Sequence, residues 1–193
     1  MKRRSKKLPL TFFKQPADIV ARELIGKILV HDLGTEKLRC RIVETEAYMG
    51  PDDLASHSSK GVTNRTKIMF GPPGRAYVYF IYGMHEMFNI IVGEAGKAHA
   101  VLLRAGEPLD GWHANLTGPG RLAKAMRIDR SHNGKEIIRG PLHFADDGFR
   151  PNQIIATPRI GIDYAKHWVE RPLRFIDPAS KHVSGKRYKP PAV

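Results

Sequence analysis

The sequence has few of the features that mark secreted, membrane or cofactor-binding proteins. Cys40 is its only cysteine, so an intramolecular disulfide is impossible and a cysteine-based zinc site is excluded. No stretch is long and apolar enough to span a bilayer, and the basic N-terminus lacks the apolar segment that a signal peptide needs. The P-loop, GxGxxG and HExxH motifs are absent. We therefore expect an intracellular protein, not a secreted or membrane one.

Acidic residues are also scarce relative to basic ones. The chain has 19 Asp and Glu against 32 Lys and Arg, which gives a formal net charge of +13 and a pI near 10.0. A surplus of this size suggests a polyanionic partner, because phosphate neutralisation is the main use of clustered Lys and Arg. On charge alone, a ribosomal-type protein or a surplus that serves solubility is an equally good interpretation.

The length of 193 residues and a hydrophobic share of 41% predict one domain with a real core. We expect that domain over residues 10–180. Residues 1–9 are predicted to be a basic flexible N-terminal tail, and residues 181–193 a basic C-terminal tail.

The hydrophobic pattern predicts more strands than helices. The expected strands lie at residues 27–31, 37–48, 76–82, 87–92 and 99–105, with short ones near 153–156 and 173–176. Helices are expected after Pro16, with Gly26 ending the helix, and after Gly118. Residues 49–75 are loop-like, and long loops are often functional. Strands that follow one another through short turns favour a single mixed α+β domain with an antiparallel sheet and flanking helices.

Two glutamates on the second strand are candidates for acid–base chemistry. Glu44 and Glu46 are two residues apart, so a regular strand puts both on the face that also carries Ile42. A carboxylate on an apolar face is partly desolvated, which makes it a better proton acceptor. The alternative is that both are ordinary surface residues at a strand end.

Aromatic and basic residues form two further candidate sites. Residues 77–84 read YVYFIYGM, and aromatic side chains on a basic protein suit the stacking of unpaired bases, although such a strand is also typical of a core. A regular strand would point Tyr79 and Tyr82 in opposite directions. Arg104 ends an apolar strand, where it could orient a carboxylate or phosphate or simply face solvent.

Taken together, these motifs resemble those of the alkyladenine (3-methyladenine) DNA glycosylase family. The resemblance covers roughly residues 10–175, and its motifs occur in the family's order. They are RIVETEAYMGP at 41–51, ASHS at 55–58, MFGPPG at 69–74, YVYFIYGM at 77–84, VLLRA at 101–105, GPGRL at 118–122, PRIG at 158–161 and RPLRF at 171–175.

The resemblance implies one mixed domain around a curved antiparallel β-sheet, with no metal or organic cofactor. It implies a monofunctional DNA glycosylase that flips alkylated or deaminated purines out of duplex DNA and hydrolyses the N-glycosidic bond with an activated water. Its partner would be double-stranded DNA containing damaged purines, and a monomer is expected. The location would be cytoplasmic and nucleoid-associated if the protein is bacterial. The resemblance does not rank 3-methyladenine, 7-methylguanine, hypoxanthine and etheno adducts as substrates.

The resemblance also assigns roles to individual residues. Glu46 matches the general base, and Arg104 and the backbone carbonyl of Ile160 match groups that help to hold the attacking water. The walls of the base pocket correspond to Tyr48, His57 and Tyr79, and the position that rejects the exocyclic amine of guanine corresponds to Asn89. The side chain that fills the vacated space in the duplex corresponds to Tyr82, with Met84 and His85 beside it.

Some points stay open at this level. His57 is the sole candidate for a general acid toward neutral bases. Glu86, beside the expected wedge, and the segment TNRT at 63–66 depart from the family pattern. The alternatives to a glycosylase are a non-catalytic lesion-binding or RNA-binding protein and a metal nuclease. The nuclease would use Glu44, Glu46, Asp52 and Asp53.

Overall fold

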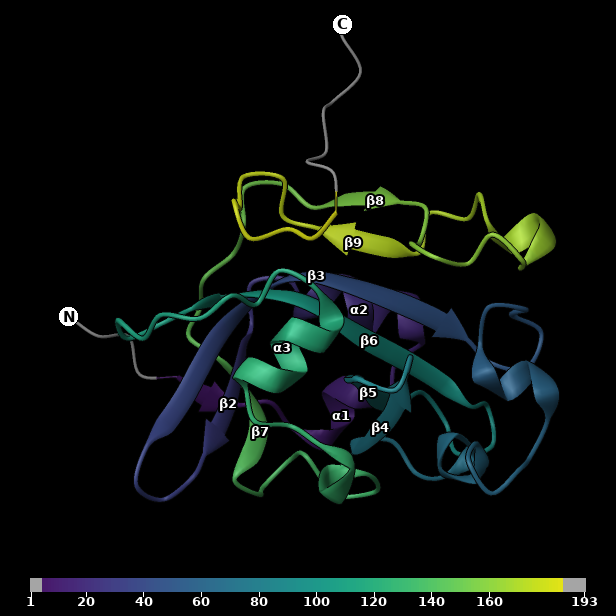
Figure 1. Ribbon diagram of the computed structural model, residues 1–193, viewed down its shortest axis with the longest axis horizontal. Helices are drawn as coiled ribbons and strands as arrows, with labels where there is room; N and C mark the ends of the chain where they lie inside the picture. The colour runs from purple at the N-terminus through teal and green to yellow at the C-terminus, as the bar shows by residue number, and fades with distance from the viewer. Residues whose placement is uncertain (1–4, 186–193) are drawn as a thin grey trace, which may run out of the picture.

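The computed structural model describes residues 5–185 and contains one curled antiparallel β-sheet with few helices (Figure 1). The central path of the sheet runs in the order β1-β7-β2-β3-β6-β5-β4, and β9 pairs with β3 and with β8. The strands are β1 (Lys6–Lys7), β2 (Ile28–Asp32), β3 (Lys37–Met49), β4 (Arg75–Ile81), β5 (His85–Val92), β6 (His99–Pro108), β7 (Leu142–Asp146), β8 (Ile155–Thr157) and β9 (Arg174–Ile176). The expected α+β class with a curved antiparallel sheet is confirmed.

Three short α-helices accompany the sheet within the described residues. They are α1 (Leu10–Phe13), α2 (Ala17–Leu24) and α3 (Pro119–Ala125). Helix α2 packs on β3, and α3 packs on β5 and β6. Pro16 at the N-cap and Gly26 with φ of +89° just beyond the end bound α2 as the sequence predicts. No helix in residues 5–185 is long and apolar enough to cross a membrane.

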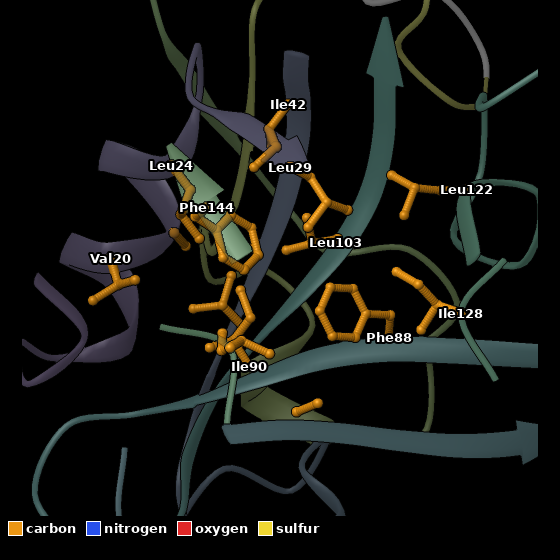
Figure 2. Packing of buried hydrophobic residues seen from close by; sticks show 14 of the residues in the cluster. Val20, Leu24, Leu29, Ile42, Phe88, Ile90, Leu103, Leu122, Ile128 and Phe144 are labelled. Atoms are coloured by element: carbon orange, nitrogen blue, oxygen red, sulfur yellow. The ribbon is translucent and has the colours of Figure 1, made fainter. Parts of the chain in front are cut away.

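The main hydrophobic core lies between the inner face of the sheet and these helices. Figure 2 shows side chains from α2, α3 and several strands converging, among them Leu24, Phe88, Leu103 and Leu122. All four are fully buried, and burying one such side chain stabilises the fold by about 1.5–3 kcal/mol. This core makes β3, β5 and β6 a rigid platform for whatever lies on their other face.

An irregularity in β3 decides which side chains reach that other face. The pairing of β3 with β6 has register shifts between Ile42 and Glu44 and between Glu44 and Thr45. Ile42 and Ala47 consequently both lie in the core cluster, and the Thr45 hydroxyl donates to the Ala21 carbonyl of α2 at 2.8 Å. The expectation that Glu44 and Glu46 share a face with Ile42 is therefore wrong, because the bulge reverses the alternation of side chains.

The segments predicted as tails lie only partly within the described residues. Residues 1–4 and 186–193 lie outside them. Lys6 and Lys7 pair with Asp146 and Ala145 of β7, and Leu8 is buried. This part of the predicted N-terminal tail therefore belongs to the sheet. At the other end, Ser184 is buried. Strand β7 was not predicted, because its five residues lie in a polar, glycine-interrupted stretch.

Candidate active site

A cavity of about 190 Å³ opens on the face of β3, β4, β5 and β6 that lies away from the main core. Its walls come from the ends of these strands, from the loop that follows β3 and from the segment that follows β8. Of the ten residues assigned a role from the sequence, seven line it: Tyr48, His57, Tyr79, Tyr82, Asn89, Arg104 and Ile160. The remaining three are Glu46, Met84 and His85, and they lie beside the cavity or beyond its rim.

Glu46 lies directly behind the cavity wall, with its side chain fully buried. Oε1 accepts a hydrogen bond from the Ile160 backbone N–H at 2.8 Å and lies 3.2 Å from Arg104 Nη1. Oε2 accepts a hydrogen bond from the Tyr48 hydroxyl at 3.0 Å. A buried carboxylate held by three lining residues is fixed in position and shielded from bulk water.

Burial also fixes the protonation states of Tyr48 and Arg104. Burial, followed by the negative charge of Glu46, raises the pKa of Tyr48 well above its ordinary value, so its hydroxyl remains a donor. For Arg104, burial alone lowers the pKa, but the carboxylates of Glu46 and Glu44 outweigh it and raise the pKa. Arg104 is therefore a permanent cation at the cavity.

Aromatic rings form one wall of the cavity. The ring centroids of His57 and Tyr79 are 4.5 Å apart, and the Tyr77 hydroxyl lies 2.9 Å from Nδ1 of His57. Burial, and then the positive charges of Arg65 and Lys60, lower the pKa of His57 to about 4. His57 is therefore neutral near pH 7 and is not a protonated general acid there.

Tyr82 lies at the tip of the β4–β5 hairpin, where it is 79% exposed. Its φ of +53° is unusual for a residue with a side chain, and such a conformation costs about 1–3 kcal/mol. Because β4 ends at Ile81, the alternation of a regular strand does not reach Tyr82. Tyr79 and Tyr82 both line the cavity, against the expectation that they face opposite ways.

Met84 and His85 flank the tip without lining the cavity. Met84 is exposed, and His85 packs so closely on α3 that a Cβ at Gly120 would lie 2.9 Å from its Cγ. The glycine at position 120 therefore permits contact between α3 and the hairpin.

The two departures from the family pattern are accommodated locally. Glu86 is paired with Arg130 at 3.0 Å, and the guanidinium of Arg130 lies 4.6 Å from the Phe80 ring centroid. The acidic charge beside the hairpin tip is therefore balanced. In the segment 63–66, the Thr66 hydroxyl accepts from the Thr63 backbone N–H at 2.8 Å. The next residue back, Arg65, lies 5.1 Å from the Tyr79 ring centroid.

Asn89 is held in one orientation beneath the cavity. Its Nδ2 donates to the Tyr77 carbonyl at 3.2 Å and to the Met87 carbonyl at 3.4 Å. Because both partners can only accept, the amide nitrogen is directed at the backbone. This leaves the amide oxygen as the atom that is free to face other groups.

The segment that follows β8 is anchored by a buried ion pair that sequence reasoning missed. Arg159 and Asp53 are fully buried and make two contacts of 2.6 and 2.8 Å. Arg159 also donates to the Ala47 carbonyl at 2.8 Å, and its guanidinium lies 4.7 Å from the Tyr48 ring centroid. This anchor fixes Ile160 beside Glu46. No local spacing signals it, because 106 residues separate the two partners.

Sequence reasoning also missed Tyr164, Arg174 and Ser184. Tyr164 is 67% exposed and lines the cavity on the side of the anchored segment. Arg174 and Ser184 are buried and contact Glu44, the carboxylate next to Glu46 on β3. RPLRF at 171–175 gave a weak signal for Arg174, whereas nothing in the sequence pointed to Ser184.

Arginines contact three of the four carboxylates that the metal nuclease alternative would use. Glu44 and Glu46 contact Arg104, and Asp53 contacts Arg159. Between residues 5 and 185, no three His, Cys, Asp or Glu side chains converge in a way that could hold a metal ion.

The chain is similar to known proteins along nearly its whole length. The model of the family described as methylpurine-DNA glycosylase (MPG) matches residues 11–181. A Legionella pneumophila (strain Lens) protein is 47% identical over 180 residues, covering 93% of this chain and 98% of its own. A Myxococcus xanthus protein is also 47% identical, with coverage of 92% and 93%. One from Methanocella arvoryzae is 44% identical over 190 residues, with coverage of 92% and 95%. Each of the three carries 3-methyladenine DNA glycosylase in its name.

Proposed function

Because this chain belongs to the methylpurine-DNA glycosylase family, we propose that it flips alkylated or deaminated purines out of duplex DNA and hydrolyses their N-glycosidic bond with a water activated by Glu46. The chain is a DNA glycosylase, a hydrolase of N-glycosyl bonds that serves base excision repair. The observation that carries the mechanistic part is the buried carboxylate of Glu46, held by Ile160, Arg104 and Tyr48 at the wall of an aromatic cavity.

The reaction needs one water molecule and one group that accepts a proton from it. The bond between the sugar C1′ and the purine nitrogen breaks, and its electron pair leaves with the purine. Positive charge develops on the sugar, as in other glycoside hydrolyses. Glu46 takes a proton from the water, whose oxygen bonds to C1′. The proton then passes to solvent when a cationic purine leaves as a neutral base, or to the purine when a neutral purine leaves as an anion, so the products are a free base and an abasic site. The negative charge of Glu46 also stabilises the developing cation, while Arg104 and the Ile160 carbonyl help to hold the water.

The aromatic wall suits the base. Purines alkylated on a ring nitrogen are cationic, and the faces of Tyr48 and Tyr79 would each contribute about 0.5–2 kcal/mol of cation–π attraction. In this proposal His57 completes the wall as a neutral ring, and Asn89 takes the role that the family resemblance implies, rejection of the exocyclic amine of guanine.

Base extrusion would use the β4–β5 hairpin. Flipping a purine costs a few kcal/mol and costs least at a damaged pair. The exposed ring of Tyr82 could enter the vacated space and offset part of that cost, with Met84 and His85 beside it. The net charge of +13 supports binding to the DNA phosphates. We further propose that the enzyme acts as a monomer and, if the protein is bacterial, is associated with the nucleoid.

Base release from defined duplexes tests this function. Duplexes with methylated purines or with hypoxanthine are incubated with the protein in excess EDTA, and free base and alkali-labile sites are measured. The proposal expects both products and no adduct on borohydride treatment, since no lysine among residues 5–185 lines the cavity. Tight lesion binding without base release would instead indicate a lesion-binding protein, and activity lost in EDTA would indicate a metal-dependent nuclease.

A further inference from the structure

A second carboxylate, Glu44, lies behind the one proposed to activate water. It is two residues before Glu46 on β3, and its side chain is fully buried. Oε1 accepts from Arg104 Nε at 2.9 Å, from Arg174 Nε at 2.7 Å and from the Ser184 hydroxyl at 2.9 Å. Oε2 accepts from the Ser184 backbone N–H at 2.6 Å. Four donors therefore converge on this one carboxylate.

These contacts direct Glu44 away from the substrate. Glu44 does not line the cavity, and its donors belong to buried residues. Burying a charge costs several kcal/mol unless partners compensate it. The four donors compensate this cost for Glu44, which suggests that a buried charge at this position has a role. Arg104 indicates that role, because it contacts both Glu44 and Glu46.

The three nitrogens of the Arg104 guanidinium have three different partners. Nε donates to Glu44, Nη2 donates to the Ser184 hydroxyl at 3.3 Å, and Nη1 lies 3.2 Å from Glu46 Oε1. The guanidinium is a rigid planar fork, so fixing Nε and Nη2 also fixes Nη1. Without Glu44, Arg104 would be free to turn and form two parallel contacts with Glu46, the favoured arrangement of an arginine–carboxylate pair.

The charges in this cluster balance only when Glu44 is included. Glu44 and Glu46 face Arg104 and Arg174, and Arg174 also donates to the Ser184 carbonyl at 3.1 Å. Removing the charge of Glu44 would leave two arginines facing one carboxylate, and that carboxylate must accept a proton during the reaction.

We infer that Glu44, together with Arg174 and Ser184, is a positioning group that holds Arg104 in a single contact with Glu46 and leaves Glu46 competent to activate water. The inference rests on the proposed roles of Arg104 and Glu46. Ser184 lies beyond residue 181, where the family match ends. The segment after β9 therefore completes the support of the catalytic pair from behind.

Single-turnover base release by a Glu44→Gln variant tests this inference. We expect the rate constant to fall by about 10²-fold, the size of effect that a misplaced catalytic group produces. The half-saturating concentration of the lesion duplex should stay within about threefold, because Glu44 does not touch the cavity. The matched control is Asp147→Asn, which removes a largely buried ion pair with Arg41 (2.8 Å) elsewhere on β3. This control should leave both quantities unchanged.

Two milder variants guard against a failure of Glu44→Gln to fold. Ser184→Ala removes one hydroxyl and should slow base release by about fivefold, the effect of a single hydrogen bond. Arg174→Lys keeps the positive charge beside Glu44 and should retain more activity than Arg174→Met. Parent-like rates in Ser184→Ala, or equal losses in the two Arg174 variants, would overturn the inference.

The crystal structure of the Glu44→Gln variant gives a readout that does not depend on activity. A changed orientation of Arg104 relative to Glu46 is expected. If Arg104 keeps its place, the positioning role is wrong whatever the kinetics show. A parent protein that releases no base refutes the proposed function, whereas an active parent with an equally active Glu44→Gln variant refutes only the role of Glu44.

Discussion

At the scale of single residues, the site depends on which side chains are charged in the folded protein and which are neutral. Glu46 is an ion-paired carboxylate, Arg104 a permanent cation, and Tyr48 a protonated donor. His57 differs, because burial and nearby cations keep it neutral. A neutral ring in the proposed base pocket would not repel a cationic purine, whereas an imidazolium would.

The pH dependence of the free energy of unfolding should report the lowered pKa of His57. The pKa of His57 is about 4 in the folded protein, below its ordinary value of 6.5. Between these two values the unfolded chain binds the proton more readily, so stability falls as pH decreases from about 6.5 to about 4. Above about pH 6.5 this penalty is absent. Urea unfolding at pH 5 and pH 7.5 should therefore show a smaller pH effect in His57→Gln than in the parent. An equal pH effect in both proteins would contradict the suppressed pKa.

At the scale of elements, irregularities in strands place the side chains that matter. The bulge in β3 turns Glu46 away from the core that Ile42 and Ala47 share. A regular strand would place Glu46 on the opposite face. The residue types at positions 42–45 do not signal the register shift. Periodicity predicted most of the strands, although not β1 or β7. It did not predict which face of the sheet the side chains of β3 lie on. In the same way, Tyr82 reaches the cavity because β4 ends one residue before it.

Tyr82, at the tip of the β4–β5 hairpin, should act as a DNA wedge, and the fold should not depend on its ring. Replacing Tyr82 by Ala removes a largely exposed ring, so thermal stability should stay near that of the parent. Lesion-duplex affinity and single-turnover base release should both fall by about tenfold or more, since the ring no longer offsets the unstacking cost of a few kcal/mol. Tyr82→Phe keeps the ring and serves as the control. Equal activity of the Ala and Phe variants would remove the wedge role.

At the scale of the whole molecule, residues far apart in the sequence complete one site. Asp53 forms an ion pair with Arg159. Glu44 forms an ion pair with Arg174 and accepts a hydrogen bond from Ser184. Such pairings depend on the three-dimensional path of the chain, so sequence spacing does not predict them. The basic surplus is different, because it is a property of composition and was evident from the sequence alone.

Binding to undamaged duplex should depend steeply on salt. If the protein contacts six or more phosphates, affinity falls by about 10³-fold or more between about 50 and about 200 mM salt, because counterions are released on binding. Fluorescence anisotropy with a labelled duplex measures this slope. A duplex with uncharged methylphosphonate linkages is the control and should show a much flatter profile. A flat profile with ordinary DNA would argue against phosphate contacts as the source of affinity.

The role of Glu46 is tested by single-turnover base release from a methylated duplex, comparing the parent with Glu46→Gln while lesion binding is measured in parallel. The glutamine is close in shape and can still accept from the Ile160 N–H, but it cannot take a proton from water. We predict a fall in rate of about 10²-fold or more, the usual contribution of a general base, with lesion affinity within a few-fold of the parent. Base release at the parental rate by a folded Glu46→Gln variant would contradict activation of water by this carboxylate.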